Sequence, residues 1–200
     1  MKRAGTFGCC VLVLLSLLWS GAQAEVTGRE QTQMIATETH ETLPNPGSFD
    51  FSTRTVTLNS GYTMPINGLG TYSLHGDECI NAMKSALQCG VRLIDTASAY
   101  GNEEEIGQAI RESMEELGIK REEIFVITKI YPGTEMANPE ASIQPCLDRL
   151  DIGYVDMMLL HHPDSNDVAA YKAMERFVQE GKIRSIGLSN WYVEELETFL

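Results

Sequence analysis

The chain has 200 residues, enough for one domain with a sizeable core, and its 43% hydrophobic and 22% charged residues are typical of a globular protein. The formal net charge is -13 at pH 7. Such an acidic surface repels phosphate backbones and anionic lipid head groups, so no nucleic-acid or membrane-surface partner is expected. An anionic cofactor would need a local basic pocket.

The first 24 residues have the pattern of a secretion signal. Lys2 and Arg3 form a basic start, residues 11–19 form an apolar run, and Ala22-Gln23-Ala24 offers small residues for cleavage before Glu25. The run is too short to cross a bilayer of ~30 Å comfortably, so we expect no stable membrane span after cleavage. An uncleaved anchor is the alternative. The pattern predicts a secreted or periplasmic protein.

Residues 25–50 are rich in Thr, Glu, Gln and Pro and have no apolar periodicity, which predicts a flexible lead-in. The following segment, 54–58, alternates polar and apolar residues, and so does 62–66. The turn-forming residues 59–61 separate them, so the sequence predicts a small hairpin. The predicted barrel domain, which includes this hairpin, covers residues 51–200.

From residue 66 onwards, short apolar runs alternate with stretches of helical spacing. The expected strands are the glycine-containing stretch 66–72 and the runs 91–94, 124–127, 154–160 and 183–188; the expected helices are 77–89, 103–117, 139–150, 167–180 and 193–200. This order predicts a parallel α/β sheet, either doubly wound or part of a (β/α)8 TIM barrel. No glycine-rich phosphate fingerprint follows a strand, which favours an incomplete barrel with about five of its eight units.

The cysteines after residue 24 are Cys79, Cys89 and Cys146. Three is an odd number, and the spacing matches no disulfide framework. Cys79 and Cys89 fall on one predicted helix, too far apart to be bridged. We expect free thiols at all three positions.

Polar residues follow the apolar runs of four successive strands. They are Asp95, Lys129, His161 and the pair Ser189-Asn190. The carboxyl ends of barrel strands share one face, where such enzymes carry their chemistry. We expect Asp95 and Lys129 to pair and Tyr100 to reach the same face. The alternative is that each polar residue only marks where its strand meets water, with Tyr100 as an apolar plug.

The adjacent residues His161 and His162 raise the question of a metal site, because imidazoles are common metal ligands. Neighbouring residues on a strand face opposite sides, so we expect that the two imidazoles do not bind one ion together. No metal site is therefore predicted. No Ser-His-acid or Cys-His arrangement has a recognisable nucleophile motif either.

Five segments together resemble the ordered motifs of the aldo-keto reductases, from about residue 54 to the end. They are Gly68-Leu69-Gly70-Thr71-Tyr72, the run from Ile94 to Glu103, Ile127-Thr128-Lys129, Leu160-His161-His162-Pro163 and Gly187-Leu188-Ser189-Asn190. The run from Asp95 to Tyr100 is highly specific, and the others are strong as a set. The resemblance implies a reductase that transfers hydride from NADPH to the carbonyl carbon of a small aldehyde or ketone.

By resemblance, four residues are catalytic. Tyr100 is the general acid, Lys129 lowers its pKa by stabilising the phenolate, Asp95 holds the lysine, and His161 orients the carbonyl oxygen. The cofactor-binding residues would be Thr71, Asp95, Ser189 and Asn190, with the last two holding the nicotinamide carboxamide. The substrate pocket would be lined by Tyr72, Tyr131 and His162.

Three strand-helix units of the family pattern do not occur within these 200 residues. In the family they carry the tyrosine that stacks on the nicotinamide and a basic loop that grips the adenosine phosphate. We therefore expect this chain by itself to bind NADP(H) weakly and to turn over little. Two alternatives are a non-catalytic binding or regulatory protein on the same scaffold, and another barrel enzyme such as a metal-dependent hydrolase or a lyase.

Overall fold

A computed structural model describes residues 47–200, so the predicted signal peptide and most of the predicted lead-in lie outside the described residues. The main element is a five-stranded parallel sheet in the order β4-β5-β6-β7-β8. Its strands are β4 (Leu69–Gly70), β5 (Leu93–Asp95), β6 (Phe125–Ile130), β7 (Val155–Leu160) and β8 (Ile183–Leu188). Strand order follows chain order, as in a barrel built from successive strand-helix units, and this confirms the predicted incomplete barrel.

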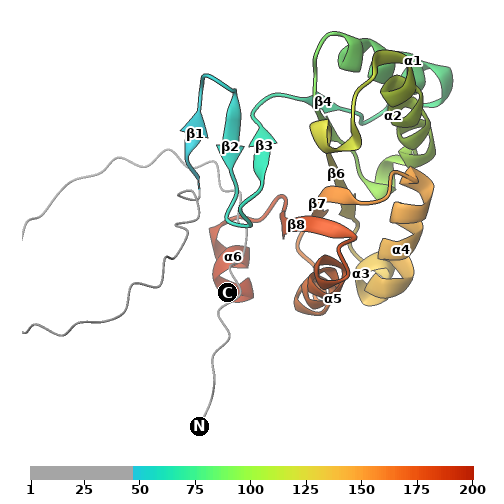
Figure 1. Ribbon diagram of the computed structural model, residues 1–200. Coiled ribbons are helices and arrows are strands. Elements are labelled where there is room, and N and C mark those ends of the chain that lie inside the picture. Colours follow the sequence, from blue (N-terminus) through green and yellow to red (C-terminus); the bar gives the residue numbers. More distant parts are fainter. Residues whose placement is uncertain (1–46) are drawn as a thin grey trace, which may run out of the picture.

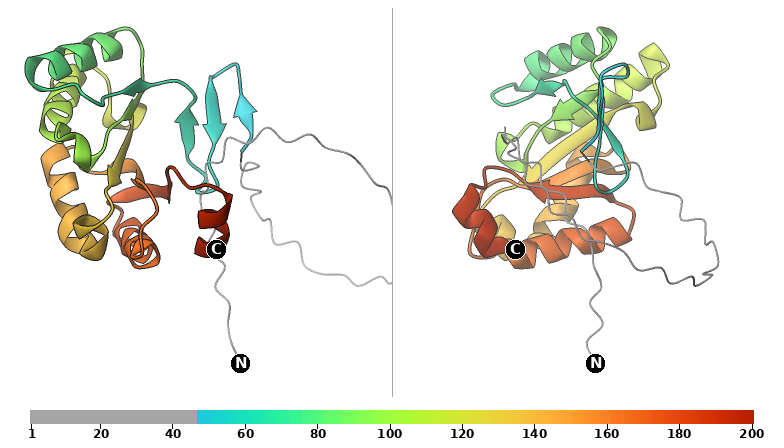
Figure 2. Two further views of the ribbon diagram at one scale, coloured as in Figure 1. Left: turned by 180° about the vertical axis from the view of Figure 1, so that it is seen from behind. Right: turned by 90° about the vertical axis from the view of Figure 1, so that its left-hand side faces the viewer.

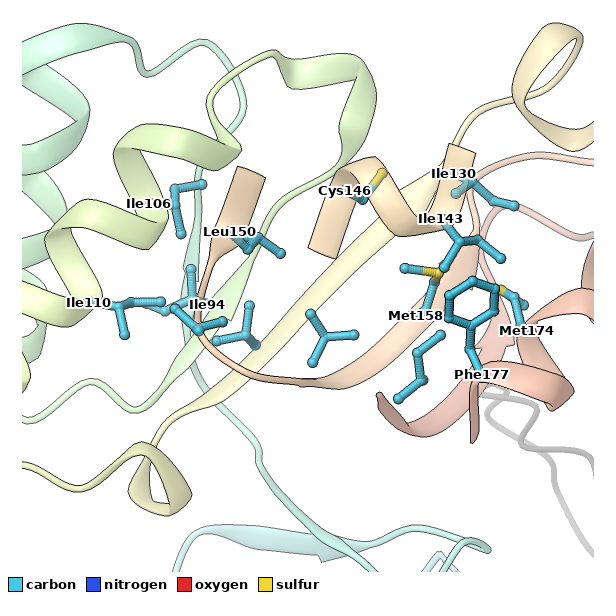
Figure 3. Close-up of a cluster of buried hydrophobic side chains, with 14 of the residues drawn as sticks. Ile94, Ile106, Ile110, Ile130, Ile143, Cys146, Leu150, Met158, Met174 and Phe177 are labelled. Carbon is cyan, nitrogen blue, oxygen red and sulfur yellow. The ribbon is translucent and has the colours of Figure 1, made fainter. Parts of the chain in front are cut away.

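Helices cover one side of this sheet (Figures 1 and 2). They are α1 (Gly76–Gln88), α2 (Glu103–Leu117), α4 (Pro139–Leu150) and α5 (Asp167–Gln179), with the short α3 (Thr134–Ala137). The terminal α6 (Val193–Phe199) follows β8 and contacts α5, where the Phe199 and Tyr171 rings meet edge-on. Their apolar faces meet the sheet in one buried core, where Ile106 and Ile110 of α2 face Ile94 and where Phe177 lies near Met158 (Figure 3). Burial of this apolar surface stabilises the sheet-helix layer.

A small antiparallel sheet lies on the other side (Figures 1 and 2). It comprises β1 (Phe49–Asp50), β2 (Thr55–Thr57) and β3 (Thr63–Pro65), so the predicted hairpin is confirmed. This sheet begins before residue 51, the predicted start of the domain, because β1 pairs Phe49 with Val56. A second apolar cluster joins the hairpin to the inner face of the parallel sheet; it contains Val56, Leu58, Met64, Phe125, Ile127, Met157 and Leu159.

Two of the boundaries that differ from those predicted concern β6 and α1. Strand β6 continues to Ile130, because its later residues pair with β7 and the Ile130 carbonyl accepts from the His161 amide. Lys129 therefore lies within a strand. Helix α1 begins at Gly76, one residue before the predicted start.

The three cysteines of the described range are free; Cys79 and Cys146 are buried and Cys89 is exposed. Burial raises the pKa of the Cys79 thiol to about 11 and that of Cys146 still further. Within residues 47–200, no helix combines the length and the apolar character that crossing a membrane requires.

Candidate active site

The carboxyl ends of the parallel strands bring the predicted polar residues to one edge of the sheet. Asp95 ends β5 and pairs in register with Gly70, next to Thr71. Lys129 pairs with Leu159 near the end of β7, and the Ser189 amide donates to the Leu160 carbonyl. This edge is where α/β barrels place their reactive groups.

Lys129 and Asp95 form the predicted ion pair, with Lys129 Nζ 2.5 Å from Asp95 Oδ1. The ammonium also donates to the Thr96 carbonyl oxygen at 2.9 Å. The lysine side chain is 6% exposed and the aspartate side chain 37% exposed. Asp95 thus compensates the burial of a cation while keeping contact with solvent.

Tyr100 ends a short 3-10 turn, Ser98–Tyr100, and its ring lies over this ion pair. Lys129 Nζ is 5.4 Å from the ring centroid, and the Tyr72 ring meets it edge-on at 5.1 Å. Burial raises the pKa of Tyr100, and the nearby Asp95 charge and the Tyr72 phenol raise it further. The net direction is upward, because burial disfavours the charged phenolate, and the lowering that the resemblance implies for Lys129 stays a prediction.

His161 follows β7 and faces Tyr100, with ring centroids 5.6 Å apart. Burial, the positive charge of Lys129 and the neighbouring His162 together lower the pKa of this imidazole to about 4. The side chain is therefore neutral near pH 7 and has one N–H to donate. Its Nδ1 atom is buried and has no hydrogen-bond partner among the described residues.

The His161 and His162 rings stack at 4.8 Å with an interplanar angle of 13°. The expectation that they face opposite sides is wrong, because both residues follow the last strand residue, Leu160, and strand alternation no longer applies. Tyr131 meets both rings edge-on. In the described part of the chain, no three His, Cys, Asp or Glu side chains group as a metal site would require.

The three predicted substrate residues surround the catalytic candidates. Tyr72 touches Tyr100, and Tyr131 and His162 touch His161. Tyr72 is 74% exposed and Tyr131 44% exposed, so both present aromatic surface to solvent at the mouth of the sheet. Such amphipathic rings suit contact with a small organic molecule.

The predicted cofactor residues differ in their freedom to bind. Asn190 has a left-handed backbone (φ 63°), and its Nδ2 donates to the His161 carbonyl at 2.8 Å and to Ser189 Oγ at 3.0 Å. Its Oδ1 has no partner within residues 47–200. Thr71 is fully buried, and its hydroxyl donates to the Asp95 carbonyl at 3.1 Å, so this hydroxyl is already used within the protein.

Sequence reasoning missed Asn102 as part of the site. It is fully buried, its Oδ1 accepts from Thr96 Oγ1, and its Nδ2 donates to the Thr71 and Leu74 carbonyls. The signal was available, because Asn102 follows Tyr100 by two residues within the family-like run from Ile94 to Glu103.

Glu103 opens α2, a position where a carboxylate usually favours the positive end of the helix dipole. The structure instead buries its side chain, with Oε1 accepting from Thr128 Oγ1 at 2.5 Å and Oε2 from Arg149 Nε at 2.9 Å. Burial raises the pKa of this carboxyl despite those donors. Because a helix terminus can face the core as well as solvent, the sequence did not reveal this role.

A second buried charge cluster lies at the opposite, amino end of the strands. Asp156 accepts from Arg121 Nη2 at 2.8 Å, from Arg184 Nη1 at 3.1 Å and from the Val126 amide at 3.0 Å. The Tyr154 ring lies between the two guanidinium groups, 4.1 Å from Arg121 Cζ and 3.8 Å from Arg184 Cζ. This amino-end cluster belongs to the face of a barrel that serves stability.

Comparison with known proteins identifies the family. Residues 66–199 match the model of the Aldo/keto reductase family. Over 149 residues the chain is 42% identical to an aldo-keto reductase of Mycobacterium tuberculosis, covering 72% of this chain and 51% of that protein. It is 38% identical over 149 residues to a protein named glyoxal reductase of Bacillus subtilis, covering 73% of this chain and 52% of the other.

Solved structures agree with this fold. An aldo-keto reductase enzyme from a Medee basin deep-sea metagenome library aligns with a TM-score of 0.65 and 41% identity, covering 71% of this chain and 52% of that one. An aldo/keto reductase from Brucella melitensis gives a TM-score of 0.64 and 36% identity, covering 72% and 57%. The chain spans about half the length of the curated relatives it matches. With its family motifs spread over most of the described residues, the chain belongs to the aldo/keto reductase family.

Proposed function

We propose that this chain carries the reaction centre of a carbonyl reductase, which reduces an aldehyde or ketone to an alcohol with hydride from NADPH. The observation that carries the proposal is the buried Lys129–Asp95 ion pair beneath the Tyr100 ring, with the His161 ring 5.6 Å from that of Tyr100. Four groups able to bind or move a proton thus converge at the carboxyl edge of the parallel sheet. Such convergence from separate strands is the usual arrangement of a barrel active site.

The protonation states suit reduction. A substrate oxygen between Tyr100 and His161 would accept hydrogen bonds from the phenol and from the neutral imidazole N–H. As negative charge develops on that oxygen, Tyr100 gives up its proton, and the Lys129 ammonium stabilises the phenolate that remains. The raised pKa of Tyr100 keeps the phenol protonated until that step.

The cofactor residues also fit a nicotinamide carboxamide. The free Oδ1 of Asn190 can accept a hydrogen bond from the carboxamide N–H, and the Ser189 hydroxyl can donate one to the carboxamide oxygen. When bound, the cofactor would supply the hydride. Asn190 and Ser189 would fix its position, and the bond from Asn190 to the His161 carbonyl would link that position to the substrate side.

We expect NADPH to bind weakly to these 200 residues. The chain has a net charge of -13, and Asp95 already offsets the Lys129 charge. An adenosine phosphate therefore finds no compensating positive field here. Fluorescence titration with NADPH should give a dissociation constant well above micromolar, and micromolar binding would contradict this expectation.

The relative named as a glyoxal reductase supports a small aldehyde as the first substrate to assay. The assay would follow NADPH oxidation with this chain and with a chimaera. In the chimaera, the sequence after Leu200 is the corresponding part of the Mycobacterium tuberculosis relative. Tyr100→Phe should lower the rate at least ~100-fold, as loss of a general acid does. Tyr62→Phe in the hairpin is the control and should leave the rate unchanged. Equal rates for the parent and Tyr100→Phe would overturn the assignment.

We also propose that the chain is exported, because its first 24 residues combine a basic start, an apolar run and a small-residue cleavage site. Amino-terminal sequencing of the protein recovered outside the cytoplasm should begin near Glu25. Recovery only from the cytoplasm, with residue 1 intact, would contradict export.

A further inference from the structure

A buried hydrogen bond closes the loop that carries Tyr100. Thr96 Oγ1 donates to Asn102 Oδ1 at 2.9 Å, and both side chains are fully buried. Within this loop, the Tyr100 amide donates to the Ala97 carbonyl at 3.0 Å. The phenol is thus presented by a short closed loop rather than by a regular helix or strand.

The amide of Asn102 also fastens this loop to the neighbouring strand. Its Nδ2 donates to the Thr71 carbonyl at 2.8 Å and to the Leu74 carbonyl at 2.9 Å, just after β4. Asn102 therefore uses three of its four hydrogen-bonding positions in a site without water access. A buried amide with both of its donors and its oxygen bonded holds its neighbours in one arrangement, because each broken bond would leave an unpaired polar group.

The next residue, Glu103, fastens the same point to β6. Its carboxylate accepts from Thr128, the neighbour of Lys129, and from Arg149 of α4. Lys129 in turn donates to the Thr96 carbonyl, at the other end of the loop. The chain segments that carry the phenol and the ammonium are therefore tied to each other by contacts outside the reaction centre.

We propose that Asn102 is a positioning residue, which closes the loop 96–102 and so holds the Tyr100 phenol against Lys129 and His161. The inference rests on the proposed function for its purpose, but the placement of the phenol can be measured without turnover. If the loop opens, the phenol gains contact with water and moves away from the Asp95 carboxylate. The pKa of Tyr100 should then fall towards that of free tyrosine, near 10.

The test is a pH titration of phenolate absorbance, in which each protein is paired with its Tyr100→Phe version so that the difference reports Tyr100 alone. Thr96→Val keeps the shape of the side chain and removes only the bond to Asn102, while the Thr96 carbonyl that binds Lys129 remains. We expect the ionisation of Tyr100 to shift to lower pH in Thr96→Val and in Asn102→Ala. Thr96→Ser, which restores the hydroxyl, should titrate as the parent does.

Asn138→Ala is the matched control, since Asn138 is exposed and its side chain bonds only to the Thr134 carbonyl among the described residues. It should leave the Tyr100 titration unchanged. If Asn102→Ala does not fold, Thr96→Val decides the question. An unchanged titration in Thr96→Val, or an equal shift in Asn138→Ala, would overturn the positioning role. Neither result depends on reductase activity, so failure of the proposed function would be seen separately in the aldehyde assay.

Discussion

The two ends of the parallel sheet both hold buried charges, and they satisfy them differently. At the amino end, Asp156 accepts from two arginines and a backbone amide, and Arg121 also donates to the Ile124 and Tyr154 carbonyls. At the carboxyl end, Asp95 and Lys129 pair beside the buried His161 Nδ1, which has no hydrogen-bond partner among the described residues.

This difference separates a stabilising site from a reactive one. A buried network in which the charges are paired adds stability and offers nothing to a ligand. Unpartnered groups beside a buried cation carry a cost that a substrate or cofactor can relieve. The amino end has one such group, the Tyr154 hydroxyl, but its ring lies between two guanidinium groups and is not free to approach a ligand.

The largest stability effect should come from the amino end. Asp156→Ala would leave the Arg121 guanidinium, whose side chain is 9% exposed, without its carboxylate. Removing one partner of a buried ion pair costs about 3–5 kcal/mol. The free energy of unfolding, measured by urea titration, should fall by that amount. A loss below about 1 kcal/mol would show that solvent reaches the arginines and would remove the contrast between the two ends.

The equivalent change at the carboxyl end should cost less. Lys129→Met leaves Asp95, which is 37% exposed and can be solvated, and takes the donor from the Thr96 carbonyl. We expect the free energy of unfolding to fall by about 1–2 kcal/mol, the cost of one unsatisfied buried acceptor. Aldehyde reduction by the chimaera should be lost at the same time. A cost equal to that of Asp156→Ala would mean that the Asp95–Lys129 pair is chiefly structural.

The carboxyl end should also respond to mild acid. Burial holds the pKa of His161 at about 4, against 6.5 for free histidine, so the unfolded chain binds the extra proton between these values. The contribution of His161 to stability is therefore complete above pH 6.5 and falls as the pH drops towards 4. Urea titrations over this range should give a smaller loss of stability with acid for His161→Asn than for the parent. Equal pH dependence would indicate that this imidazole is solvated.

The smallest effect compares two serines of one segment, one within β8 and one just after it. Ser185 Oγ, near the middle of β8, lies 2.7 Å from Ser60 Oγ of the hairpin. Ser185→Ala should lower the free energy of unfolding by about 1 kcal/mol, the net value of one hydrogen bond. Ser189→Ala, just after the same strand, should leave stability unchanged and weaken NADPH binding. The reverse result, with Ser189 carrying the stability, would break the division between the ends.

The sequence predicted the elements that have strong periodicity or clear end signals. Helices α2 and α4 have the predicted bounds, because three glutamates open α2 and Gly118 ends it in a left-handed conformation. Asp95 and Lys129 could be paired in advance, since parallel strands align their carboxyl ends. These predictions needed only local pattern and the topology of a parallel sheet.

What could not be predicted depends on long-range contacts. The burial of Glu103 requires Thr128 and Arg149 to approach it from other elements, and no local pattern encodes that approach. The raised pKa of Tyr100 depends on its burial and on the nearness of Asp95 and Tyr72, which only the folded structure decides. The stacking of His161 on His162 depends on where β7 ends.

The state of the cysteines has a consequence for redox chemistry. A thiol reacts as its thiolate, and burial keeps Cys79 and Cys146 protonated and out of reach. An oxidant or an alkylating reagent should therefore modify Cys89 first within residues 47–200, at the carboxyl-terminal end of α1. Labelling of the other two thiols requires local opening of the core, so its rate would measure how often the core around each of them opens.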